Sequence, residues 1–527
     1  MTLGTPTTAP RDSMHTRREH WALIAAIFAS GFCGMVAEYS VGTTVSFLLG
    51  DSITAYTLTI SIFMLAMGVG AILSQQFPDG DELSIFLFVE AALSVVCAGS
   101  TLFITYAALL DLAWTATVLI AFLIGLLIGF EIPLLTRFNE RRQILLKSNM
   151  AMVFGADYLG SFIAGLSYSM LLLPTLGTVL TPVFSGALNL SIAALLAFTF
   201  RDEFPPKRIA ICGILAAGTL LFLGLQGEKL AFDADQDLFE DPVIFVEQSK
   251  HQRIHITHLN GINCLHLNGG TQFCSHDERR YHELLVHPAF CLKPDARRVL
   301  ILGGGDGLAV REVLKYPNAQ AITLVDLDPL VVEISRTHPI IRKLNEEALD
   351  DPLVTIHHED AYVWLKNNSE FWDIILIDLP DPERVELAKL YSLEFYRNLR
   401  NHLAPDGAIA LQSTSPLHAT RAFGIIWATL TRAGLSTVPY RIQVPSFGDW
   451  GFNIAVRDDH LSTDQMKARL DAFEERVPLQ VLNQAAMQAA TRFEKGLLPD
   501  NPDSLEISRL LNPTIHLAYR EAWEHER

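Results

Sequence analysis

The chain has 527 residues, half of them hydrophobic, and a formal net charge of −18. This length is enough for at least two domains. The negative charge argues against nucleic acid as a partner, because nucleic-acid affinity depends on basic side chains. It would suit a cationic substrate, although acidic surfaces are commonly only solvated faces.

Seven apolar stretches precede residue 227, and each reaches or approaches the ~20 residues that span a bilayer. Stacked helices of a soluble protein would carry a polar face, and these stretches mostly have none. We therefore predict a cytosolic N-terminal segment, 1–20, and a multi-span α-helical membrane domain of about seven helices, 21–229, in the lipid bilayer of the cell inner membrane. The stretches are 21–48, 53–75, 83–109, 113–136, 150–173, 176–200 and 208–226.

Basic residues predict the topology of this domain. They precede the first span and lie between spans four and five and between spans six and seven, so the positive-inside rule places the N-terminus in the cytosol. Seven spans would then place the C-terminal half outside. The residues are Arg11, Arg17 and Arg18; Arg137, Arg141, Arg142 and Lys147; and Arg201, Lys207 and Arg208.

The second half opens with a β-hairpin subdomain, predicted over 230–295. Arg253–Leu259 and Cys264–Leu267 have the pattern of hairpin strands, and Asn268-Gly269 is a type I′ turn signal. Regular pairing across this turn would place Cys264 opposite Phe273, so a disulfide between Cys264 and Cys274 is not expected. The hairpin histidines, His255 and His266, have no metal-ligand pattern and are expected on the surface, and the six cysteines have no zinc spacing.

An α/β pattern follows, in which helical segments separate five short apolar strands. It predicts a doubly wound, Rossmann-like domain of the methyltransferase type over 296–460, followed by a helical C-terminal segment, 461–527. The strands are Val299–Leu302, Ala321–Val325, Val354–His357, Ile374–Ile377 and Ala408–Gln412.

The turn Gly303-Gly-Gly-Asp-Gly307 joins the first of these strands to a helix. Such a turn directs backbone N–H groups and a helix N-terminus at a nucleoside ligand. A glycine turn alone is weak evidence, but Asp306 directs a carboxylate at the ligand. The ligand should therefore carry a cation, which an ordinary dinucleotide does not.

Acids also follow the next three strands, at the edge where α/β folds bind their ligands. We expect Asp326 to bind ribose hydroxyls and Asp360 to meet the adenine amino group, while Asp378 and Asp381 follow the fourth strand. Taken singly, each acid is more often a helix cap, and Asp328 before Pro329 is the clearest candidate for a cap alone. Acids after four consecutive strands are harder to explain as caps.

These motifs resemble those of the spermidine synthase (polyamine aminopropyltransferase) family, in its membrane-anchored form, over about residues 245–456. Asp277-Glu-Arg-Arg-Tyr-His-Glu283, Gly303–Gly307, Asp378–Pro382, Gln252 and Gly448-Asp-Trp-Gly-Phe452 carry the resemblance. In the first half, Gly129-Phe-Glu-Ile-Pro-Leu134 and Ala156-Asp-Tyr-Leu-Gly160 resemble the family's membrane domain. The chain departs from the family where Glu383-Arg384 replaces Gly-Pro, Leu379 a small hydroxyl residue and Ala361 a glycine. The changed residues border the expected acceptor pocket, so they bear on which amine is the acceptor more than on the reaction.

The resemblance implies transfer of the aminopropyl group of decarboxylated S-adenosylmethionine to a small polyamine, most simply putrescine. Asp378 would be catalytic. No permanently bound cofactor and no metal are expected, and the chain should form a homodimer. The co-substrate would be bound by Gln252, Gly303, Gly304, Gly305, Asp306, Gly307, Asp326, Asp360 and Ala361, and the amine groups by Tyr281, His282, Asp306, Asp378, Asp381, Gln412 and Trp450.

Two alternatives stay open. A methyltransferase on the same fold would bind a carboxylated donor, which Asp306 would repel, and such enzymes tend to have an acid at the place of Ile301. A polyamine transporter or sensor would use the soluble half only to bind ligand, and four acids inside apolar stretches keep it open. They are Glu38, Glu90, Glu131 and Asp157.

The side of the membrane is a separate expectation. The donor derives from cytosolic metabolism, so we expect a cytosolic catalytic domain. Seven spans and a cytosolic N-terminus do not allow this, and an eighth crossing or a re-entrant segment would be needed.

Overall fold

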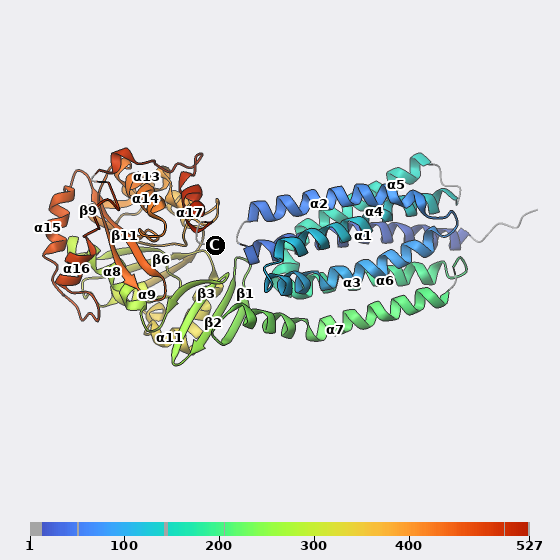
Figure 1. Cartoon of the computed structure of the whole chain (residues 1–527), viewed down its shortest axis with the longest axis horizontal. Coiled ribbons are helices and arrows are strands. Elements are labelled where there is room, and N and C mark those ends of the chain that lie inside the picture. The colour runs from blue at the N-terminus through green and yellow to red at the C-terminus, as the bar shows by residue number, and fades with distance from the viewer. Residues whose placement is uncertain (1–12, 50–51, 142–145, 205, 500, 525–527) are drawn as a thin grey trace, which may run out of the picture. The chain divides into compact units, whose positions relative to one another are not determined.

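The computed structural model describes residues 13–49, 52–141, 146–204, 206–499 and 501–524. The chain divides into two compact units, Met1–Val243 and Ile244–Arg527, whose elements are labelled in Figure 1. Arg11 and Arg142, which enter the topology prediction, lie outside the described residues.

The first unit is helical. Six stretches of it are long and apolar enough to cross a membrane, by length and composition. Within the unit, Arg137 pairs with Asp79 at 2.6 Å and Arg141 with Glu82 at 2.8 Å. Its helices are α1 (Ser13–Leu49), α2 (Ser52–Leu73), α3 (Glu82–Ala108), α4 (Ala113–Arg141), α5 (Leu146–Ser167), α6 (Leu173–Thr199) and α7 (Pro206–Leu238), with a π turn at Tyr168–Leu172.

The longest apolar stretch, Asn149–Thr199, contains two helices that run in opposite directions. Along α5, Ser161 donates to Gly31 O, and the following Tyr168 donates to Thr43, so the chain advances along α1. Along α6, Ser185 donates to Cys33 O, so the chain has returned. The chain reverses at Gly177. Its φ of 67° and ψ of −172° are not helical and interrupt the helix there. Six apolar stretches therefore correspond to the seven helices α1–α7.

The second unit begins with a four-stranded sheet in the order β1-β2-β3-β4. The predicted type I′ turn is confirmed, because Asn268 and Gly269 have φ values of 51° and 83°. Its strands are β1 (Val243–Gln248), β2 (Arg253–Leu259), β3 (Ile262–Leu267) and β4 (Gly270–Cys274).

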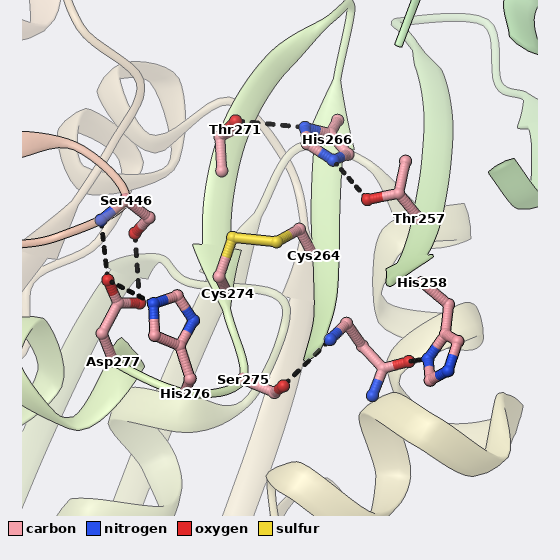
Figure 2. Close-up of a disulfide and its surroundings, with 11 residues drawn as sticks. Thr257, His258, Cys264, His266, Thr271, Cys274, Ser275, His276, Asp277 and Ser446 are labelled. Atoms are coloured by element: carbon pink, nitrogen blue, oxygen red, sulfur yellow. Dashed lines mark hydrogen bonds and ion pairs between the residues drawn. A yellow bond between two sulfur atoms is a disulfide. The ribbon is translucent and has the colours of Figure 1, made fainter. Parts of the chain in front are cut away.

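The expectation about the hairpin cysteines is wrong: Cys264 and Cys274 form a disulfide (Figure 2). A β-bulge shifts the β3–β4 register between Leu265 and His266, so that Phe273 pairs with Leu265 and Cys274 with Cys264. One extra residue on β4 thus brings the two cysteines together, and regular pairing could not show this.

The hairpin histidines are also not on the surface. His255 and His266 are 3% and 8% exposed. His266 lies between the hydroxyls of Thr257 and Thr271, at 3.0 and 3.1 Å (Figure 2). Burial lowers the pKa of His266 to about 4, so the imidazole is neutral at physiological pH.

A seven-stranded mixed sheet follows, in the order β10-β11-β9-β8-β5-β6-β7. The five predicted strands are its parallel part, which confirms the Rossmann-like fold, and β10 and β11 are antiparallel strands that were not predicted. The strands are β5 (Arg298–Gly303), β6 (Ala321–Asp326), β7 (Val354–His358), β8 (Trp372–Asp378), β9 (Leu403–Gln412), β10 (Leu435–Val444) and β11 (Gly448–Arg457).

Helices cover both faces of this sheet. Alternate residues of β5 enter separate cores: Val299 and Ile301 belong to one cluster, and Leu300 and Leu302 to the other. Burial on both faces is typical of parallel strands in α/β folds. The helices are α8 (Glu278–Leu292), α9 (Leu308–Leu314), α10 (Pro329–Thr337), α11 (Pro339–Leu344), α12 (Ala361–Asn367), α13 (Leu393–His402), α14 (Thr420–Arg432), α15 (Thr463–Asp471), α16 (Gln484–Ala490) and α17 (Thr514–Glu524).

Candidate active site

The glycine turn after β5 brings the ends of three strands together. A side chain at Gly303, where φ is 79°, would place its Cβ 2.0 Å from Asp378 O, and one at Gly305 would lie 2.7 Å from the Asp326 carboxylate. Gly305 N also donates to Asp326 Oδ2 at 2.9 Å. Only glycine therefore allows β5 to approach the ends of β6 and β8 this closely.

Two of the predicted acids and one histidine form a compact group. One side-chain ligand atom from each of His282, Asp306 and Asp378 lies within 4.8 Å of the others. Tyr281 donates its hydroxyl proton to Asp378 Oδ1. His282 is buried, whereas the two carboxylates are only half-buried, so they keep the access that a ligand-binding group needs.

The charges of this group depend on one another. Burial raises the pKa of Asp378 to about 6, the nearby Asp306 carboxylate adds to the rise, and the pKa of Asp306 is raised by burial as well. Burial would lower the pKa of His282, but its hydrogen bond with Glu278 and the surrounding acids raise it to about 9. At neutral pH, His282 is therefore an imidazolium beside Asp306 and Asp378.

This protonation bears on metal binding. The three groups are close enough to hold a metal ion. A histidine ligates a metal only when it is neutral, and the pKa of His282 is raised to about 9. The raised pKa of His282 opposes metal binding at neutral pH, and the absence of a metal stays a prediction.

The acids around Tyr281 and His282 anchor helix α8. Glu278 forms a bidentate ion pair with Arg311, at 2.8 and 2.9 Å. Glu283 accepts hydrogen bonds from three consecutive backbone N–H groups, 480–482. Asp277 accepts from Ser446 N at 2.7 Å and from its hydroxyl at 3.1 Å, which holds the loop after β10 (Figure 2).

That loop leads into β11, and Phe447 of the loop contacts both Tyr281 and Trp450 of β11. Phe447 lies with its ring centroid 6.1 Å from Tyr281 and 5.3 Å from Trp450. The indole N–H of Trp450 is buried and has no hydrogen-bond partner within the described part of the chain. An unused donor at this place is consistent with a role in binding a ligand.

Gln412 positions the loop between Asp378 and Asp381. Its amide nitrogen donates to Leu379 O at 2.6 Å and to the Tyr391 hydroxyl at 2.7 Å. Tyr391 in turn donates to Pro380 O at 2.8 Å. The amide nitrogen of Gln412 therefore has its partners within the protein. Tyr391 positions the loop between Asp378 and Asp381, and no sequence motif indicated this role.

Asp381 lies at the far side of this loop. Burial raises its pKa to about 6, although Gln412, Thr414 and Tyr519 lie close enough to lower it. Its Oδ1 is buried without a hydrogen-bond partner among the described residues, so it can accept a ligand. Tyr519 belongs to α17, where His516 also hydrogen-bonds Pro382 O at 3.1 Å. No sequence motif connects this helix with the site.

The expected nucleoside side is built around β6. Burial raises the pKa of Asp326 to about 6, and its Oδ1 accepts from Asp328 N at 2.9 Å. Asp328 caps α10 as predicted, through Leu330 N at 3.1 Å. It is not a cap alone, because its Oδ2 also accepts from Ser249 at 2.6 Å and from Gln252 at 3.0 Å.

Two further segments remain: Asp360 and Ala361, which were predicted to bind the nucleoside, and Glu383 and Arg384, which depart from the family pattern. Asp360, which precedes Ala361, caps α12 by accepting a hydrogen bond from Tyr362 N at 2.9 Å. Its other carboxylate oxygen pairs with Lys389 at 2.6 Å, so both oxygens have partners within the protein. Its contact with adenine stays a prediction. Glu383 and Arg384, which replace the family's Gly-Pro, pair with each other at 3.4 Å.

Comparisons with known proteins agree with this geometry. Residues 278–467 match the family model described as the spermine/spermidine synthase domain. The chain is 38% identical to the polyamine aminopropyltransferase of Oceanobacillus iheyensis over 94% of its own length and 96% of that protein. It is 36% identical to polyamine aminopropyltransferase 1 of Streptomyces coelicolor over 99% and 98% of the two chains.

Among solved structures, a spermidine synthase in complex with the transition-state analogue AdoDATO is similar to this chain. It is 27% identical, with a TM-score of 0.44, over 48% of this chain and 85% of that one. The identity to the curated relatives extends over both units. The chain therefore belongs to the spermidine synthase (polyamine aminopropyltransferase) family and is an aminopropyltransferase.

Proposed function

We propose that the chain transfers the aminopropyl group of decarboxylated S-adenosylmethionine to a diamine, with putrescine as the acceptor. The observation that carries this is the close approach of Asp306 and Asp378, with Tyr281 bound to Asp378. Two adjacent carboxylates suit a donor that carries an ammonium group and a sulfonium. They disfavour the carboxylated donor of a methyltransferase, because like charges repel.

In this proposal the donor lies across the ends of β5 and β6. The N–H groups of the glycine turn, 303–307, and Asp326 hold the nucleoside, with Gln252 and the segment of Asp360 and Ala361 at its rim. Asp306 binds the propylammonium group. His282, as an imidazolium, lowers the pKa values of Asp306 and Asp378 and so favours the ionised form of each carboxylate.

The acceptor lies between the two aspartates of the loop after β8. Asp381 binds its distal ammonium, and Asp378 accepts a proton from the reacting one, because an ammonium has no lone pair. The freed nitrogen attacks the propyl carbon beside sulfur, and a C–N bond forms. The C–S bond breaks with its electron pair on sulfur, which releases neutral methylthioadenosine. Tyr281 and Trp450 orient the amine.

The reaction itself is the first test. Purified full-length protein should release methylthioadenosine from the decarboxylated donor only when putrescine or another diamine is present. A metal chelator should leave this rate unchanged. Release of S-adenosylhomocysteine from S-adenosylmethionine would instead support the methyltransferase alternative.

The second prediction concerns Tyr519, which acts on Asp381 from α17. Tyr519→Phe removes a hydrogen-bond donor from a charged group, worth about 1.5–3 kcal/mol. We expect the KM for the acceptor to rise about tenfold or more with little change in the KM for the donor. The effect should grow as the pH falls toward 6, since the Asp381 pKa rises further without its donor.

Tyr396→Phe is the matched control, because the Tyr396 hydroxyl is buried without a partner in the described structure and lies outside the proposed site. It should change neither KM. Equal effects of the two substitutions would show that Tyr519 is not an acceptor-binding residue.

We also propose that the helical unit is embedded in the inner membrane, that the protein is a homodimer, and that the catalytic unit faces the cytosol, where the donor is made. Two observations oppose the cytosolic face. Among the described residues, an odd number of helices, α1–α7, precedes the catalytic unit in sequence, and a Cys264–Cys274 disulfide is typical of oxidising compartments.

Fusion reporters after Arg527 decide the sidedness. The proposal predicts activity of a cytosolic reporter and reduced, alkylatable thiols at both cysteines in cells. A reporter that works only outside the cytosol, with thiols protected until reduction, would overturn it.

A further inference from the structure

The helical unit contains acids without basic partners. Residues 19–136 and 148–200 include neither Lys nor Arg. Glu90 and Glu131 lie within α3 and α4, only 1% and 2% exposed, and neither forms an ion pair among the described residues. Acids in such surroundings are costly unless something compensates for them.

Glu90 and Glu131 belong to two helices that pack against each other, α3 and α4. They are close enough for their charges to interact. Ser30 donates to one oxygen of Glu131, while the other oxygen and both oxygens of Glu90 are buried with no hydrogen-bond partner in the described structure. Three acceptor atoms at this place are therefore unused.

Asn189 on α6 is an independent sign of a ligand. Thr101 of α3 donates to Thr178 O of α6, and Gly186 packs against Ser94 O, so the two helices are antiparallel. One turn beyond this contact, Asn189 lies level with Glu90. It is 1% exposed, and its amide nitrogen has no partner among the described residues. A neutral polar group is thus left unsatisfied beside the two acids.

We propose that Glu90, Glu131 and Asn189 form an intramembrane site for a linear polyamine cation. The inference rests on the proposed function, because polyamines are then the cations that this protein handles. Separate carboxylates on two helices suit separate ammonium groups, and the apolar lining suits the methylene segments between them. Asn189 can donate to a neutral amine nitrogen. A single metal ion fits less well, since no three His, Cys, Asp or Glu side chains of the described helical unit converge closely enough to share one.

The test measures binding of labelled spermidine to full-length protein in phosphatidylcholine nanodiscs. The Asp378→Asn/Asp381→Asn variant removes the proposed acceptor site, so that only the intramembrane site remains. We expect this variant to keep saturable spermidine binding. Adding Glu90→Gln and Glu131→Gln should weaken that binding by about tenfold or more.

Glu38→Gln is the matched control, since Glu38 is another acid of an apolar helix but is not among the charges that act on Glu90 or Glu131. It should leave the binding unchanged. Glutamine keeps the shape of each side chain and costs less to bury, and the single variants, Glu90→Gln and Glu131→Gln, serve if the combined one does not fold.

Two results would overturn the site: no spermidine bound to the Asp378→Asn/Asp381→Asn variant, or binding that the Glu90 and Glu131 substitutions do not change. Methylthioadenosine release by the wild-type chain is measured in parallel. Release without intramembrane binding refutes only the intramembrane site. Binding that depends on Glu90 and Glu131 without release refutes only the proposed function.

Discussion

Asp378→Asn should lower turnover by about 10²–10⁴-fold, the usual contribution of a positioned general base. Asparagine keeps the shape and the hydrogen bond from Tyr281 but accepts no proton from the ammonium. Asp306→Asn is the matched comparison at the other carboxylate, and it should mainly raise the KM for the donor. Steady-state kinetics with each substrate varied in turn separates the two roles.

The pH profile gives this prediction its sharpest form. The pKa of Asp378 is raised to about 6, so its carboxylate is ionised above pH 6 and becomes protonated below it. Wild-type turnover should therefore fall as the pH drops through about 6, and the residual activity of Asp378→Asn should lack this limb. Near-normal turnover of the variant from pH 7 to 9 would show that Asp378 is not the base.

Glu278→Gln should produce the largest loss of stability. The Glu278 carboxylate compensates both Arg311 and His282, and all three side chains are about 2% exposed. Removing Glu278 leaves the buried His282 imidazolium without its acidic partner and Arg311 with Glu312 alone, at 2.9 Å, which costs about 3–5 kcal/mol. Thermal unfolding of the full-length protein in detergent measures the loss. Glu346→Gln is the matched control, because Glu346 is 60% exposed in its pair with Arg279 and should change the stability by less than about 1 kcal/mol.

The pH dependence of this loss follows from the two pKa shifts. Burial opposes the shift at Glu278, but His282 and Arg311 lower its pKa to about 2, so its contribution to stability is complete above its ordinary value of 4.5 and disappears as the pH falls toward 2. The pKa of His282 is raised to about 9, so its contribution is complete below its ordinary 6.5 and disappears as the pH rises through 9. The deficit of Glu278→Gln should be greatest between about pH 5 and 6.5. A deficit equal to that of Glu346→Gln would contradict the role of the buried pair.

The sequence by itself determined the features that depend on local order. The five parallel strands, the glycine turn with Asp306, the Asp328 cap and the Asn268-Gly269 turn were all predicted from short patterns. Acids after consecutive strands were expected to meet because parallel strands end at one edge of a sheet, and the register places Gly303 beside Asp378. Seven apolar stretches were likewise predicted from length and composition, and the described part of the first unit contains the helices α1–α7.

Only the tertiary structure decided which distant groups meet. One extra residue on β4 joined Cys264 to Cys274, although regular pairing predicted otherwise. Tyr519 reaches Asp381 from a helix near the end of the chain, and Gln412 and Tyr391 hold the loop between the two aspartates. His282 and Arg311 lower the pKa of Glu278, and Glu278 raises the pKa of His282. Such pairings depend on the packing of elements far apart in sequence, and on the burial that packing produces, which no local pattern encodes.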